Sequence, residues 1–245
     1  MGRCKLCYQD RPLHNSHIIP EFFYTYAYDG KHRLHELSRD TGTMDFRQKG
    51  IREPLLCGDC EQLLNERYED YVKEAWYDRG KLPRVPTRAP HNIEGLDYRR
   101  FKLCLLSILW RASVSRQEFF ENVSLGVRHE EALRQMISKD DPGDETLYPF
   151  VCGVLWLPDA KSGAPYVVRD PAMAPTPKRY NHKYVYRFMF GGCSWDFLVG
   201  TDADFGKLSI KRSGTLSIGW LALHRLPEMR QFLADYERAR RRRAS

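Results

Sequence analysis

The chain has 245 residues, of which 42% are hydrophobic, so it is long enough to bury one large core or two small ones. Its formal net charge of +7 and its pI of about 9.0 make a polyanion such as nucleic acid a suitable partner. No apolar run approaches the roughly 20 residues that a membrane-spanning helix needs, and the first residues match neither a signal peptide nor a myristoylation pattern. We therefore expect a cytoplasmic protein with no membrane partner.

Two Cys-x-x-Cys motifs enclose the first part of the chain: Cys4 and Cys7 form one pair, and Cys57 and Cys60 form the other. Two residues between paired cysteines let both sulfurs reach one ion, and two such pairs complete a tetrahedral zinc site. Disulfides or unrelated core thiols are the alternative, but the absence of an export signal favours reduced cysteines. We therefore predict a structural Zn2+ ion on these four residues. The remaining cysteines are expected to be reduced in apolar surroundings: Cys104, Cys152 and Cys193.

The segment between the two pairs must fold back to bring them together. Residues 15–20, Asn-Ser-His-Ile-Ile-Pro, are expected to contain a short strand around the two isoleucines, which the proline ends. The aromatic residues of 22–28 are interpreted as a small core beside the zinc site rather than as a base-stacking surface. Residues 40–43 are expected to form a turn. A helix is predicted over residues 59–78, where apolar residues recur at helical spacing.

The composition changes after this helix. Residues 81–95 are rich in proline and are interpreted as an extended linker between a domain at 1–80 and a second domain at 96–245. Short connections between its strands favour antiparallel pairing in the second domain. Its helices are expected at 96–111, 128–137 and 226–243, and its strands at 150–157, 166–168, 184–190, 195–199 and 214–223.

The N-terminal domain resembles one known family. A Cys-x-x-Cys pair, a His-Ile-x-Pro segment that starts at His17, and a Leu-Cys-x-x-Cys segment that runs into a helix together resemble the HNH nucleases. The resemblance covers about the first third of the chain and implies a treble-clef, or ββα-metal, scaffold. The expected fold is therefore α+β, with a zinc-bound ββα-metal unit followed by a mixed module of helices and antiparallel strands.

The resemblance also implies roles for particular residues. His17 would be the general base, because an imidazole with a pKa of about 6.5 suits proton abstraction near neutral pH. Ser16 and Glu61 stand at the positions of ligands for a catalytic Mg2+ or Mn2+ ion, and Asn65 lies one helical turn beyond Glu61. In the alternative interpretation, His17 is a hydrogen-bonded histidine beside the zinc site, Glu61 favours the helix N-terminus, and Asn65 is a surface residue.

Two positions depart from the family's pattern. Ser16 is a neutral hydroxyl and a poor Mg2+ ligand, so another carboxylate, such as Glu53 or Asp59, would have to replace the expected acidic or imidazole group. Residues 52–54, Arg-Glu-Pro, stand where the family has an asparagine that orients the base, and its loss alone would not remove the base. Both departures favour, as an alternative, a scaffold without activity.

We therefore expect a metal-dependent endonuclease that hydrolyses phosphodiester bonds in DNA, with a double-stranded substrate. The alternatives are a catalytically inactive treble-clef zinc module that binds nucleic acid or a protein partner, and one subunit of a larger complex. Arginines are the expected phosphate contacts, although those of the C-terminal tail are equally well interpreted as a solvated chain end. These residues are Arg84, Arg88, Arg99, Arg100, Arg240, Arg241, Arg242 and Arg243.

Overall fold

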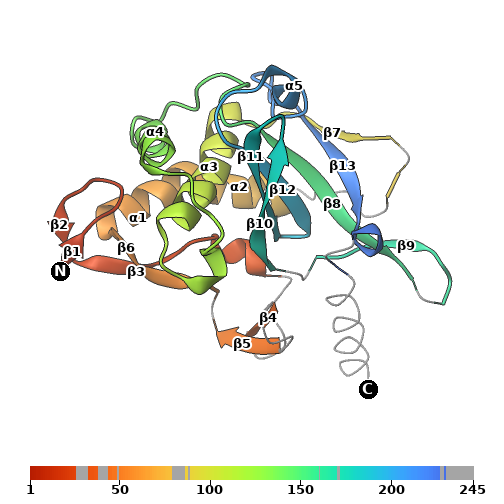
Figure 1. The fold of residues 1–245 in the computed structure, drawn as a ribbon, viewed down its shortest axis with the longest axis horizontal. Helices are drawn as coiled ribbons and strands as arrows, with labels where there is room; N and C mark the ends of the chain where they lie inside the picture. Colours follow the sequence, from red (N-terminus) through yellow and green to blue (C-terminus); the bar gives the residue numbers. More distant parts are fainter. Residues whose placement is uncertain are drawn as a thin grey trace.

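The computed structural model describes residues 1–25, 33–37, 44–48, 50–78, 86–87, 89–159, 161–169, 172–226 and 229. Within these ranges helices and strands are mixed, so the predicted α+β class is confirmed. Figure 1 shows the main helices gathered on one side of a seven-stranded sheet; one small hairpin lies beyond them at the N-terminus, and a second lies at the bottom of the view.

A hairpin and a helix follow one another in the N-terminal part. Strand β3 (Leu13–His17) pairs antiparallel with β6 (Arg52–Cys57), and in this register His17 lies opposite Arg52. Helix α1 (Gly58–Leu64) starts directly after β6. The end of β3 and the start of α1 therefore lie in one small unit, although they are about 40 positions apart in the chain.

Two further hairpins accompany this unit. Strands β1 (Gly2–Arg3) and β2 (Asp10–Arg11) flank the first cysteine pair and pair with each other. Strands β4 (Arg33–Leu37) and β5 (Met44–Gln48) pair antiparallel in the connection between β3 and β6. The turn predicted at 40–43 lies outside the described residues.

The predicted strand around Ile18 is wrong by a few positions. Strand β3 ends at His17, and a 3-10 turn (Glu21–Tyr24) begins after Pro20, whose ring excludes further ladder pairing. The backbone N–H of Ile18 still donates to the carbonyl of Ile51 at 3.1 Å, so the chain leaves the hairpin gradually.

The aromatic residues after β3 are core residues, as predicted. Phe23 and Tyr24 are buried, and the Phe23 ring packs edge-on against Phe190 with its centroid 4.7 Å away. Phe22 packs edge-on against Tyr77. The two remaining aromatic residues of this stretch, at positions 26 and 28, lie outside the described residues.

The helix predicted over 59–78 is confirmed. It is one helical run composed of α1, a π-helical turn (Asn65–Glu69), α2 (Asp70–Lys73) and a second π-helical turn (Glu74–Asp78). The wider π turns rotate the later side chains relative to α1. The apolar part of its buried face includes Leu64, Tyr68, Val72, Ala75 and Trp76.

Helix α3 (Tyr98–Val114) is the central helix of the molecule. The side chain of Asp97 caps its N-terminus by accepting the N–H of Arg100 at 2.9 Å. From Phe101 to Ala112 every side chain is buried, which is typical of a helix enclosed on all sides. Helix α4 (Val127–Ser138) packs against it. Both were predicted, whereas the helix predicted at 226–243 lies almost entirely outside the described residues.

The large sheet has the order β10-β11-β12-β8-β13-β7, and β9 pairs with β8. All its pairs are antiparallel except β8 with β13, which run parallel. Two of these strands were not predicted: the edge strand β10, and the edge strand β7, which belongs to the stretch interpreted as a linker. The strands are β7 (His91–Ile93), β8 (Phe150–Pro158), β9 (Pro165–Val167), β10 (Met173–Tyr180), β11 (Lys183–Phe190), β12 (Cys193–Leu198) and β13 (Leu216–Ala222).

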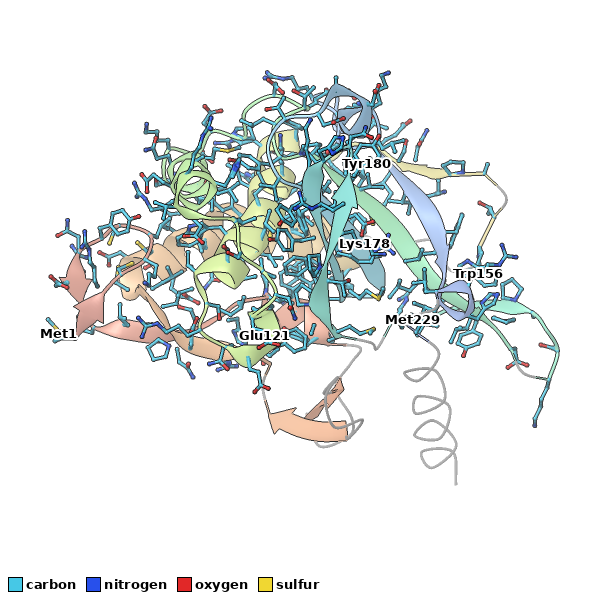
Figure 2. The ribbon with its side chains drawn as sticks, in the orientation of Figure 1. Met1, Glu121, Trp156, Lys178, Tyr180 and Met229 are labelled. Atoms are coloured by element: carbon cyan, nitrogen blue, oxygen red, sulfur yellow. The ribbon has the colours of Figure 1, made fainter. Side chains whose placement is uncertain are left out.

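One buried cluster joins the N-terminal unit to the sheet. It includes Cys4, Cys57 and Cys60 of the N-terminal unit and residues of the large sheet such as Ile218. At its centre, Trp76 lies 5.3 Å from both Phe101 and Trp195, measured between ring centroids. Figure 2 shows side chains filling the space between the helices and the sheet. The N-terminal unit is therefore supported from behind by α3 and the sheet.

Candidate functional site

The four cysteines of the two motifs come together as predicted. The sulfur atoms of Cys4, Cys7, Cys57 and Cys60 all lie within 4.8 Å of one another. A tetrahedral zinc ion with Zn–S bonds of about 2.3 Å requires sulfurs roughly 3.8 Å apart, and the sulfurs of Cys7 and Cys57 are 3.8 Å apart. The four residues could therefore hold a metal ion such as zinc.

Local hydrogen bonds shape the first cysteine pair. The N–H of Cys4 donates to the carbonyl of Gln9 at 2.9 Å, and the N–H of Tyr8 donates to the carbonyl of Cys4 at the same distance. Tyr8 adopts a φ of 61°, which turns the chain sharply after Cys7. The N–H of Cys57, at the end of β6, donates to the Cys4 sulfur at 3.3 Å. The two pairs are thus joined by the backbone as well as by their thiols.

The electrostatics of the cluster favour one thiolate. Burial opposes ionisation of Cys4, but backbone hydrogen bonds from Cys7 and Cys57 outweigh it and lower its pKa to about 7. Burial raises the pKa of Cys60 well above its usual range, and the hydrogen bond with the sulfur of Cys57 raises it further. Four sulfurs at this spacing cannot all be ionised unless a cation lies among them, and a bound zinc ion would supply that charge.

Ser16 and Glu61 also meet. Ser16 is fully buried on β3, and its hydroxyl donates to Oε2 of Glu61, in the first turns of α1, at 2.6 Å. The same hydroxyl accepts the backbone N–H of Leu56 at 3.3 Å, which orients it toward the helix. The two predicted ligand positions, 45 residues apart, therefore lie side by side.

His17 belongs to a separate group of charged residues. Its side chain is 17% exposed, and Nε of Arg52, from the opposite strand, donates to its Nε2 at 2.8 Å. Because Nε2 accepts this bond, the imidazole is neutral in this arrangement. Glu21 completes the group, with Oε2 3.9 Å from the His17 ring and 3.6 Å from Nη2 of Arg52.

Arg52 and Glu21 were not predicted as part of this site. Two signals could have identified them: Arg52 lies opposite His17 across the hairpin, and Glu21 lies four residues after His17. The cationic group next to the predicted base therefore comes from the stretch where the family's asparagine was expected.

A buried arginine from α3 holds the backbone of His17. Nη1 of Arg111 donates to the carbonyl of His17 at 2.8 Å, and Nη2 donates to Oε1 of Glu69 at 2.8 Å. The Arg111 side chain is 1% exposed. Burial raises the pKa of Glu69 although Arg111 opposes the shift. No sequence pattern could identify this contact, because 94 positions separate Arg111 from His17.

The other carboxylates considered as metal ligands have different partners. Both oxygens of Glu53 accept the backbone N–H of Arg116, at 3.1 and 3.2 Å. Asp59 is largely exposed and pairs with Arg11. Asn65 is exposed on the helix surface. Among the described residues, the cysteine cluster is the one group of three or more metal-ligating side chains, so Glu61 belongs to no such group.

Two of the predicted phosphate contacts can be placed. Arg99 pairs with Asp140, and Arg100 lies 3.6 Å from Asp97, while both guanidinium groups remain about half exposed. They line a cavity of about 260 Å³ together with Arg67. The remaining predicted contacts lie outside the described residues: Arg84, Arg88, Arg240, Arg241, Arg242 and Arg243.

Comparison of the chain with known proteins identified no relative. No protein-family model matches the chain, and no match was found among the curated proteins or the solved structures. Within the described ranges, no helix is both long and apolar enough to cross a membrane.

Proposed function

We propose that the chain is a metal-dependent endonuclease on a treble-clef, or ββα-metal, scaffold that hydrolyses phosphodiester bonds in DNA. The observation that carries the proposal is the 2.6 Å contact between Ser16 and Glu61. It brings the strand residue next to His17 against the acid at the start of α1, which is the arrangement that such a scaffold requires. The four cysteines would hold the structural zinc ion behind it.

The proposed roles follow from the chemistry of each side chain. His17 would take the proton of the attacking water through Nε2, which first has to release Arg52. The released guanidinium of Arg52 would then lie beside the phosphate, whose geometry it matches. Glu61 offers one carboxylate, and Mg2+ sites commonly use one or two carboxylates with substrate phosphate and water. When bound there, Mg2+ or Mn2+ would stabilise negative charge on the phosphate and the leaving oxygen.

A plasmid-cleavage assay tests the proposal. Supercoiled DNA is incubated with the zinc-loaded protein and Mg2+ or Mn2+, with and without EDTA, and nicking that EDTA abolishes is the expected result. His17→Ala should abolish nicking while zinc content and circular dichroism stay unchanged. His14→Ala, at an exposed position of the same strand, is the matched control and should cut like the wild type. Undiminished cutting by His17→Ala would refute the assignment of the base.

One observation favours a second candidate function. Arg52 already occupies Nε2 of His17, and Ser16 already occupies Oε2 of Glu61, so both proposed reactive groups are engaged by neighbours. This arrangement suits a non-catalytic zinc module that binds nucleic acid or a protein, alone or within a larger complex. Salt-sensitive gel retardation of DNA without nicking in either metal would support the binding module and exclude cleavage by the isolated chain.

A further inference from the structure

A second cavity lies away from the cysteine cluster and His17. It has a volume of about 520 Å³ and lies between one face of α4, the loop that follows α4, and the residues after β12. Small-molecule sites typically have volumes of about 300–1,000 Å³. Part of its lining is apolar and comes from Ala132, Met136 and Leu147. The cavity therefore has the size and the apolar surface that a small organic ligand requires.

The charged residues of the lining favour an anion. Arg128 and Lys139 lie at opposite ends of the α4 face, roughly 16 Å apart along the helix axis at 1.5 Å per residue. Asp141 is the one carboxylate among the lining residues, and its Oδ1 accepts the N–H of Gly143 at 2.9 Å. The positive charges therefore exceed the negative charge, and the carboxylate is oriented toward its own loop.

A neutral polar pair lies between these charges. Nδ1 of His129 is 2.9 Å from the hydroxyl of Tyr148, and the two rings pack edge to face. Burial, with Arg128 nearby, lowers the pKa of His129, and burial raises the pKa of Tyr148. Both groups are therefore uncharged at neutral pH. They can exchange hydrogen bonds with a ligand's hydroxyl or amine groups without weakening the attraction of the cations.

The backbone around this pair is strained. Tyr148 adopts a φ of 45°, in the left-handed region that bulky residues rarely occupy. Its N–H donates to the carbonyl of Gly200 at 2.6 Å, and Gly200 itself has a φ of 98°. The neighbouring Leu147 forms a β-bridge with Thr201. Such strain is concentrated at binding and catalytic sites. Here it holds the Tyr148 ring against His129 in the wall of the cavity.

We infer that this cavity binds a small organic phosphate of nucleotide size. Its phosphate would pair with Arg128 or Lys139, and its ring would pack on Met136 and Leu147. Its hydroxyl groups would exchange hydrogen bonds with the His129–Tyr148 pair. Cations beside an apolar wall and a neutral polar pair match the three chemical parts of a nucleotide, whereas inorganic phosphate would use only the cations.

Isothermal titration calorimetry with the full zinc-loaded chain tests the inference. Adenosine monophosphate and inorganic phosphate are titrated separately into the wild type and into the Arg128→Ala, Lys139→Ala and double variants. Both side chains are exposed, so the variants should fold normally, and thermal unfolding checks this. Lys161→Ala is the matched control: it removes the same charge from the exposed hairpin between β8 and β9, far from α4 in Figure 1.

The expected result is saturable binding of adenosine monophosphate, with inorganic phosphate at least tenfold weaker. The double variant should lose about 10- to 100-fold in affinity, which corresponds to one or two hydrogen bonds to a charged group, while Lys161→Ala binds like the wild type. Absence of binding by the nucleotide, or binding that the double variant retains, would overturn the inference. Equal affinity for phosphate and nucleotide would overturn the inference that the ligand's ring and hydroxyl groups are recognised, because the cations alone would then account for binding.

Discussion

Replacing Arg111 by methionine should unfold the protein at markedly lower urea concentration. The guanidinium donates to described partners on three elements: to Ser107 on its own helix, to Glu69 on the preceding helix and to the carbonyl of His17. Methionine preserves most of the volume but leaves the Glu69 carboxylate, 11% exposed, without its cation. Removal of one partner from a buried ion pair costs about 3–5 kcal/mol, and we expect Arg111→Met to lose that much.

The size of this loss depends on the charge of Glu69, so pH and a second mutation test the reasoning. Burial already raises the pKa of Glu69, and loss of Arg111 would raise it further. Above about pH 4.5 the unfolded state releases this proton more readily than the folded state, so the destabilisation should shrink as the pH falls from 7.5 to 5.5. The double variant Arg111→Met with Glu69→Met removes the buried charge and should recover at least about 2 kcal/mol.

Tryptophan fluorescence during urea unfolding measures these differences. Arg116→Met is the matched control: it removes an exposed guanidinium just beyond the same helix and should change stability by less than about 0.5 kcal/mol. If Arg111→Met lies within 1 kcal/mol of that control, or if the double variant is no more stable than the single one, the buried pair does not hold α3 to the hairpin as described.

Three further predictions concern the metal, a buried lysine and a tight turn. Cys60→Ser should bind far less zinc than the wild type, which we expect to retain one ion per chain in elemental analysis after dialysis; equal zinc content would exclude the four-sulfur site. Burial lowers the pKa of Lys102 to about 8, so the unfolded state binds more protons above that pH and stability should rise by up to about 3 kcal/mol between pH 8 and 10.5. Lys102→Met should lose this rise in urea titrations, and an unchanged pH profile would contradict the assignment. Gly191→Ala should lower the melting temperature more than Gly163→Ala does: both glycines have positive φ, but only at Gly191 would a new Cβ collide with the hydroxyl of Tyr77.

Several features of the fold follow from local patterns in the sequence. The Cys-x-x-Cys spacing predicts the four-sulfur cluster, because two residues between ligands set the sulfur geometry whatever surrounds it. The helices at 59–78 and 96–111 follow from apolar residues at helical spacing. Strand β10 escaped prediction because it contains Pro175 and Pro177, which argue against a central strand; it is an edge strand, where proline is tolerated.

Other features depend on packing between distant segments. Strand β7 has only three residues and lies in a proline-rich stretch, so β13 rather than its own composition decides that it pairs. The parallel pairing of β8 with β13 likewise has no local signal. Within the candidate site, the sequence determined which cysteines meet and which histidine belongs to the His-Ile-x-Pro segment. Only the tertiary structure decided that Glu61 meets Ser16 and that Arg111 holds His17, because a hydrogen bond between distant residues depends on how the intervening core packs.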